Sequence, residues 1–207
     1  MTHHTATHHI MRAVILAGAT LGLSVSAHAQ DSTYTSLNEE TCRTLSVSEE
    51  GIATRVGLAC EGLDGWTVYR EADDHGEWAG FSQGDVMPDR LPYGGYLGNF
   101  GHFHSVIEWR RDTDGTAFAT IHRYYSTVFD TGEPEGVSVL IVTGLRPGAD
   151  PEACHVGYVV ASEVEDANTQ ARLMADEMAP HIACDDHRPF RIDAEIPSVI
   201  QLIPLQH

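Results

Sequence analysis

The sequence predicts an α+β domain, in which an antiparallel β-sheet of about six to eight short strands carries one C-terminal amphipathic helix packed on a face. Two observations lead to this class. Short runs rich in Val, Ile and aromatic residues alternate with turn signals such as Asp64-Gly65 and Asp114-Gly115, and their connections are too short for the crossover helices of a parallel sheet. Near the C-terminus, residues 166–179 change to a helical period.

Composition limits both the size class and the partners of the chain. Its 207 residues suit one domain with or without a tail, and a hydrophobic content of 42% is enough to build a core. Acidic residues number 30 against 12 basic ones, which gives a formal net charge of -18. Because such a charge repels phosphate backbones and anionic lipid surfaces, we expect no nucleic-acid partner.

Residues 1–29 are predicted to be a signal peptide. A positively charged start and an apolar run precede Ala27-His28-Ala29, which fits the small-x-small cleavage rule, so the mature chain is expected to begin at Gln30. The apolar run is shorter than the roughly 20 residues of a membrane-spanning helix. We therefore expect a periplasmic or secreted protein with no membrane span after signal cleavage.

Residues 30–188 are predicted to form a single α+β domain, followed by a C-terminal extension over 189–207. The extension is apolar and is interrupted by Pro197 and Pro204, so it is compatible with an edge strand and equally with a docked tail. The strands expected within the domain are 43–48, 52–59, 66–70, 77–81, 103–111, 116–125, 137–143 and 155–162.

The expected helix runs from about Asp166, a suitable N-cap residue, to Ala179, and Pro180 stops it. Its apolar residues recur at helical spacing, which draws one stripe that must be buried against the sheet. These residues are Ala167, Ala171, Met174, Ala175, Met178 and Ala179.

Four cysteines lie in the expected mature chain, and an even number in an exported protein favours disulfides over a zinc site. Four cysteines allow three pairings. Spacing favours the pairing of neighbours, because Cys42 and Cys60 bracket two strands and a turn, while Cys154 starts a strand and Cys184 follows the helix.

The segment 80–84 reads Gly-Phe-Ser-Gln-Gly and matches the G-x-S-x-G pattern of a nucleophile elbow, which makes Ser82 a candidate catalytic serine. This likeness to cutinases, which are small secreted serine esterases, concerns the motif and the size of the chain. An elbow needs a buried strand before the serine and a helix after it, whereas a turn signal follows Ser82. We therefore interpret the segment as a polar turn and keep the esterase as an alternative.

A second candidate site comes from the hairpin around Asp112-Thr113-Asp114-Gly115. If Asp112 pairs with Thr116, alternation places His104, Glu108 and His122 on one solvent-accessible face. Two imidazoles and a carboxylate are suitable ligands for a divalent metal ion. The sequence thus allows a metal site at these three residues, against the simpler interpretation that the face is only solvated.

Several stretches together resemble a group of secreted or periplasmic proteins from proteobacteria that have two disulfides and no assigned activity. The stretches are Cys42-Arg-Thr-Leu, Cys60 with the later Trp66, Glu108-Trp-Arg, Asp114-Gly, Ala117-Phe-Ala-Thr-Ile-His-Arg-Tyr and the region from Cys154 to Cys184 around Asp166-Ala-Asn. The resemblance covers most of the expected mature chain, apart from the part after His187. The resemblance implies export, pairing of neighbouring cysteines and a final helix. It identifies no catalytic residue.

These observations favour a non-enzymatic binding or interaction module whose partner is an envelope protein or a small ligand, with no cofactor. The two alternatives are a periplasmic protein that binds a divalent metal through the histidine face, and a secreted serine esterase that uses Ser82. Labelling by a fluorophosphonate and metal analysis of the mature protein would distinguish them.

Overall fold

The computed structural model describes residues 31–50, 53–74, 76–84, 100–126, 136–184 and 188–203. These residues form ten β-strands and one α-helix, α1 (Ala167–Met178), together with short 3-10 turns that include η1 (Glu39–Thr41), η4 (Ala179–His181) and η5 (Val199–Gln201). The strands are β1 (Asp31–Ser36), β2 (Arg43–Glu50), β3 (Ala53–Glu61), β4 (Thr67–Asp73), β5 (Gly76–Ser82), β6 (Gly101–Arg111), β7 (Ala117–Ser126), β8 (Val137–Leu145), β9 (Ala153–Val160) and β10 (Phe190–Ile192).

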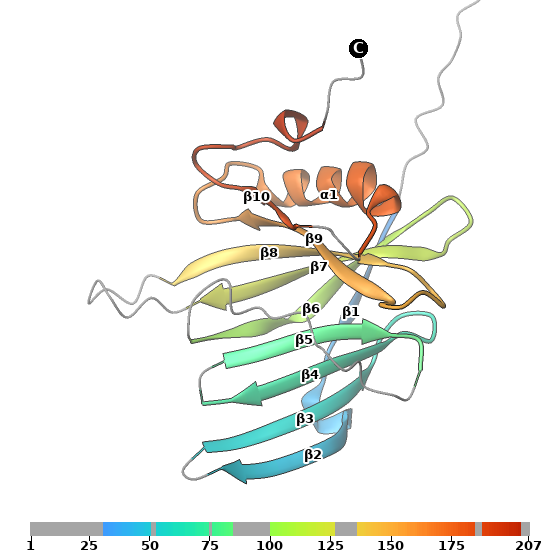
Figure 1. Ribbon diagram of the computed structural model, residues 1–207, viewed down its shortest axis with the longest axis vertical. Helices are drawn as coiled ribbons and strands as arrows, with labels where there is room; N and C mark the ends of the chain where they lie inside the picture. Colours follow the sequence, from blue (N-terminus) through green and yellow to red (C-terminus); the bar gives the residue numbers. More distant parts are fainter. Residues whose placement is uncertain are drawn as a thin grey trace, which may run out of the picture.

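The strands divide into two sheets (Figure 1). The larger has the order β1-β6-β7-β8-β9-β10, and the smaller has the order β2-β3-β4-β5. All pairs are antiparallel except β9 with β10. Helix α1 covers one face of the six-stranded sheet, and side chains of the four-stranded sheet pack against the opposite face. The described chain therefore has three layers.

The α+β class is confirmed, whereas a single sheet of about six to eight strands is wrong, because the described residues form ten strands in two sheets. Strand β1 was not expected from the sequence. Its residues, Asp-Ser-Thr-Tyr-Thr-Ser, lack the alternation of apolar and polar residues that marks a half-buried strand. Since β1 is an edge strand whose side chains are half-buried or exposed, it does not need that alternation.

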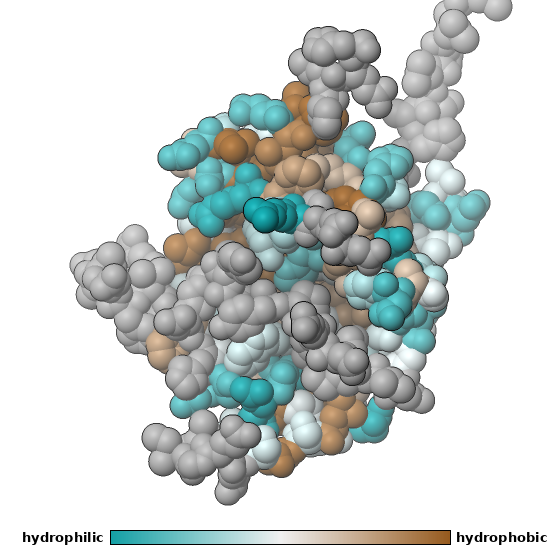
Figure 2. All heavy atoms as spheres, viewed as in Figure 1, coloured by the Kyte–Doolittle hydropathy of each residue, from teal (hydrophilic) through white to brown (hydrophobic). Residues whose placement is uncertain are grey.

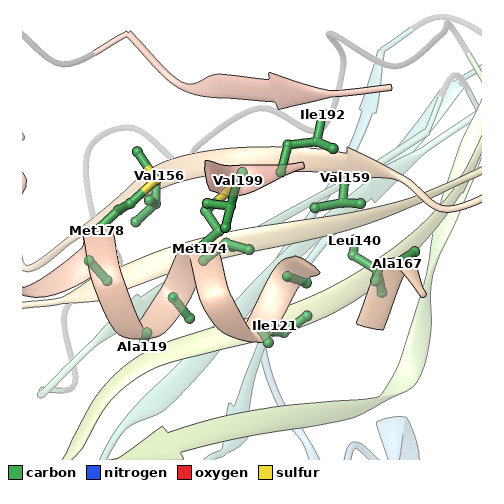
Figure 3. Close-up of a cluster of buried hydrophobic side chains, with 14 of the residues drawn as sticks. Ala119, Ile121, Leu140, Val156, Val159, Ala167, Met174, Met178, Ile192 and Val199 are labelled. Atoms are coloured by element: carbon green, nitrogen blue, oxygen red, sulfur yellow. The ribbon is translucent and has the colours of Figure 1, made fainter. Parts of the chain in front are cut away.

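The helix packs where its apolar stripe predicts (Figure 3). Ala171, Met174 and Ala175 are fully buried against the six-stranded sheet. Below Met174, Gly157 of β9 leaves room for the close approach, since a Cβ atom at that position would lie 2.6 Å from the methionine sulfur. Asp166 is the N-cap residue of α1, as expected, but its backbone is left-handed, with φ of 54°, and its side chain makes no capping bond.

A second part of the core fills the space between the two sheets. Trp109 and Ile107 of β6 are fully buried there, and the ring of Trp109 meets Phe81 of β5 edge-on at a centroid distance of 5.7 Å. The indole N–H of Trp109 donates to the hydroxyl of Thr35 in β1 over 2.8 Å. Contacts between aromatic rings of this kind stabilise a core beyond the area that they bury.

The C-terminal segment is part of the fold, because β10 is the sixth strand of the larger sheet. Ile192 is fully buried and Val199 is 1% exposed, and both belong to the cluster under α1 (Figure 3). The boundary expected after residue 188 therefore does not separate two packing units. Both interpretations of the extension hold, since it forms an edge strand and then docks through η5.

Both disulfides have the expected pairing. Cys42 joins Cys60, and Cys154 joins Cys184. The first bond closes the β2–β3 hairpin of the smaller sheet, and the second connects the start of β9 to the segment after η4. Disulfides persist in oxidising compartments, so the pair indicates that the folded protein is not cytoplasmic.

Candidate functional site

The hairpin of β6 and β7 has a register that moves His122 to the face opposite to the one expected. Next to the turn, Arg111 pairs with Ala117 as the sequence predicts, but Phe118 is an extra residue, so that Arg110 pairs with Ala119. A β-bulge of one residue reverses the face of every side chain beyond it. His122 consequently lies opposite Ile107 and is only 2% exposed.

The expected metal site at His104, Glu108 and His122 is therefore wrong. Glu108 faces α1, whereas His122 points into the space between the sheets. In the parts of the chain that the structure describes, no three His, Cys, Asp or Glu side chains lie close enough together to hold a metal ion.

Hydrogen bonds also occupy one imidazole nitrogen of each histidine, Nδ1 of His104 and Nε2 of His122. The Nδ1 atom of His104 accepts from the backbone N–H of Val106 over 3.0 Å, so the neutral ring carries its proton on Nε2. His122 Nε2 lies 2.7 Å from the carbonyl oxygen of His104 and must donate to it. A metal at either nitrogen would have to displace one of these bonds.

Glu108 is held by an ion-pair network that fastens α1 to the edge of the larger sheet. Arg172 donates to both oxygens of Glu108, over 2.6 and 3.1 Å, and the hydroxyl of Ser32 donates to the carboxylate over 2.6 Å. Arg110 donates to Ser32 and, through Nε and Nη2, to the carboxylate of Asp176 over 2.8 and 2.7 Å. Burial alone would raise the pKa of Glu108, but its bonds to Arg172 and Ser32 hold it below its ordinary value.

Ser82 lies at the end of β5 in an antiparallel sheet, so it lacks the parallel strand that leads into an elbow. Its hydroxyl donates to Glu152 over 2.5 Å, and the same carboxylate accepts from the backbone N–H groups of Gln83 and Gly148. The bond from Ser82 is the main cause that lowers the pKa of Glu152, which makes this carboxylate a weak base. The arrangement ties the smaller sheet to the β8–β9 turn of the larger one.

A polar layer lies between the two sheets. Arg70 of β4, which is 5% exposed, donates to Glu77 over 2.6 Å and to Glu39 over 2.5 Å. Glu77 also accepts from the backbone N–H of Phe103 over 2.8 Å, and the ring of Phe103 stacks on that of His122 with centroids 4.6 Å apart. This chain of contacts brings the guanidinium and the imidazole into one region.

Four buried polar atoms in the described chain have no hydrogen-bond partner. They are Arg70 Nε, Thr120 Oγ1, His122 Nδ1 and Ser126 Oγ. The last three belong to one face of β7, because they are separated by even numbers of residues. Buried polar groups without partners are rare and costly, so each one needs an explanation.

The environment of His122 opposes its protonation. Burial is the main cause that lowers its pKa to about 4, and the charge of Arg70 acts in the same direction. His155 lies on the same face of the sheet two strands away, opposite Thr143, and its Nδ1 atom is 2.8 Å from the hydroxyl of Tyr158. Desolvation also lowers the pKa of His155 to about 4.

The polar layer was missed because a strand pattern shows which residues share a face and not what covers that face. Thr120 and His122 alternate with Ala119 and Ile121 along β7, as polar residues do on a solvated face of a sheet. Only the position of the smaller sheet shows that they are buried.

The described helices are too short and too polar for any of them to cross a membrane. Comparison of the chain with protein-family models, curated proteins and solved structures gives no match.

Proposed function

We propose that this chain is an exported, non-enzymatic binding module that contacts an envelope protein or a small ligand. One observation carries the proposal: three of the four side chains that suggested chemistry hold the fold together. Ser82 bonds to Glu152, Glu108 is enclosed by arginines, and His122 is buried. The carboxylate that accepts from Ser82 has a lowered pKa, so it is a poor general base for acyl transfer.

Location in the periplasm or outside the cell is part of the same proposal. The small-x-small motif that ends at Ala29 and the resemblance to secreted proteins support it, and the two disulfides agree with it. We expect the exported protein to begin at Gln30. Mass spectrometry of the N-terminal peptide from a periplasmic or medium fraction measures this directly, and an intact residue 1 on exported material would contradict it.

The C-terminal segment is the surface that best suits contact with a partner. It exposes Ile196, Ile200 and Ile203, of which Ile200 is the most exposed at 68%. Figure 2 shows apolar residues gathered at the end of the molecule that carries α1 and this segment. Exposed apolar side chains close together on a surface are typical of interaction sites.

The experiment is crosslinking in living cells that produce the full chain, followed by quantitative comparison with two variants. We expect Ile200→Glu to abolish capture of a specific partner. Val47→Glu should leave that capture unchanged, because Val47 is similarly exposed, at 62%, but lies in β2. Equal capture by all three proteins would refute the assignment of the surface.

The esterase alternative gives the opposite result in a labelling experiment. We expect a fluorophosphonate not to label Ser82, because its hydroxyl donates to a carboxylate with a lowered pKa and not to an imidazole. Peptide mapping after treatment of the folded protein checks this, with a known serine esterase as the positive control. Labelling at Ser82 that Ser82→Ala removes would establish a hydrolase instead.

A further inference from the structure

Four strands lie at the edges of the two sheets, and three of these edges are protected against pairing with another chain. Strand β2 has a bulge between Thr44 and Ser46, and β10 is only three residues long. Strand β5 lies against β6 of the other sheet (Figure 1). Bulges, short edge strands and cover from another element are the usual means by which soluble proteins prevent edge-to-edge association.

Strand β1 has none of these protections. It pairs with β6 over six consecutive residues without a bulge, and no described strand pairs with its other edge. Its sequence, Asp-Ser-Thr-Tyr-Thr-Ser, contains no proline or lysine, and its one charged residue, Asp31, lies at the start. The backbone N–H and C=O groups along this edge are therefore a template for another strand.

Tyr34 occupies the middle of this edge as an exposed aromatic residue. It lies opposite Glu108 on the face of the sheet that carries α1, and it is 53% exposed. Arg172 of α1 donates to its hydroxyl over 3.1 Å and so holds the ring at the edge. Contacts between aromatic rings on neighbouring antiparallel strands stabilise the strand pair.

Two copies of β1 are complementary to each other as an antiparallel pair. Such a pair of identical strands has a two-fold axis perpendicular to the sheet, which keeps α1 of both copies on the same face. Since side chains alternate between faces, each residue must then lie opposite one an even number of positions away or opposite its own counterpart. The register centred on the middle of the edge pairs Tyr34 with Tyr34, Ser32 with Ser36 and Thr33 with Thr35. It leaves Asp31 outside the pairs, so no like charges lie opposite each other.

We propose that the free edge of β1 is a dimerisation surface, at which two copies of this chain join their six-stranded sheets into one continuous sheet centred on Tyr34. The surface is independent of the one at Ile200, so failure of one proposal leaves the other standing.

The molar mass of protein purified from cells that produce the full chain, measured by sedimentation over a range of concentrations, tests the dimer. We expect the mass to double as the concentration rises, and we expect Tyr34→Lys to remove the dimer because two lysines would face each other across the axis. Val47→Lys is the matched control, since Val47 is similarly exposed on the edge strand β2, and it should dimerise as the wild type does. Added salt should strengthen the dimer, because it screens the repulsion between two chains of net charge -18.

Disulfide trapping tests the register and does not depend on how well the lysine variant folds. A disulfide requires Cα atoms about 4.4 to 6.8 Å apart, so identical residues can crosslink only where they meet at the axis. We expect Tyr34→Cys to crosslink with its own counterpart. Thr33→Cys should crosslink only when it is mixed with Thr35→Cys.

Three results would overturn the proposal. The first is a monomer at every concentration and salt level, and the second is a dimer that Tyr34→Lys does not weaken. If Ile200→Glu removed such a dimer, the interface would lie at the C-terminal segment instead. The third is a monomeric purified protein whose Tyr34→Cys variant crosslinks in cells to a different polypeptide, which would assign the edge to an extended segment of another protein.

Discussion

Replacement of Arg110 by leucine is expected to lower the free energy of unfolding by about 3 to 5 kcal/mol. Arg110 is 5% exposed and makes a two-bond pair with Asp176 of α1, besides its bond to Ser32. Leucine would remove from the partly buried carboxylate of Asp176 the guanidinium that donates two hydrogen bonds to it. Chemical denaturation of the wild type and the variant at neutral pH measures the difference.

Arg55→Ala is the matched control for this experiment. Arg55 also pairs with two carboxylates, those of Glu71 and Asp73, at 3.6 and 3.3 Å, but its side chain is 51% exposed. Exposed pairs contribute about 0 to 1 kcal/mol, so the control is expected to change stability by less than 1 kcal/mol. Equal losses for Arg110→Leu and Arg55→Ala would show that burial of the network contributes nothing.

Stability is expected to fall as the pH decreases from about 6.5 to about 4. In the unfolded chain the imidazole of His122 titrates near 6.5, whereas in the folded protein its pKa is lowered to about 4. Between these values the unfolded state binds a proton that the folded state does not, so acid favours unfolding. Because one pKa unit corresponds to about 1.4 kcal/mol, His122 alone accounts for about 3 kcal/mol. His155 acts in the same direction.

Denaturation of His122→Gln across the same pH range isolates this contribution. We expect the variant to lose less stability between pH 6.5 and 4 than the wild type, whatever its stability at neutral pH, because it has one fewer group to protonate on unfolding. His181→Gln, at an exposed position in η4, is the control and should keep the steep wild-type dependence. An unchanged pH dependence for His122→Gln would show that the ring is not held neutral.

Local patterns in the sequence predicted the elements more accurately than their assembly. The eight expected strands and the helix lie within a few residues of the observed ones, and the neighbouring cysteines pair as expected. The division into two sheets was not predicted, because alternation specifies which side of a strand is apolar and not which sheet the strand joins. The sequence left the segment of β10 open between an edge strand and a docked tail, because its three residues are too few to carry a period.

The candidate site was wrong because of a single residue. Phe118 is an extra residue in β7, and nothing in the local sequence marks it as a bulge. Had Arg110 paired with Phe118, His122 would share a face with Glu108, as the sequence allowed. An apolar residue in the bulge is acceptable here because Phe118 packs beside the cluster under α1.

Each disulfide lies within one layer of the molecule, and this placement affects how the two sheets separate on local unfolding. Cys42–Cys60 lies within the four-stranded sheet, and Cys154–Cys184 lies within the layer formed by the six-stranded sheet and α1. Neither described disulfide joins one sheet to the other, so the sheets are held together by hydrogen bonds such as Ser82 to Glu152, by the ion pair of Arg111 with Asp64 and by apolar contacts. We therefore expect each layer to behave as its own cooperative unit in native-state hydrogen exchange. Amides of β4 and β5 should exchange when the sheets separate, while amides of β7 and β8 stay protected.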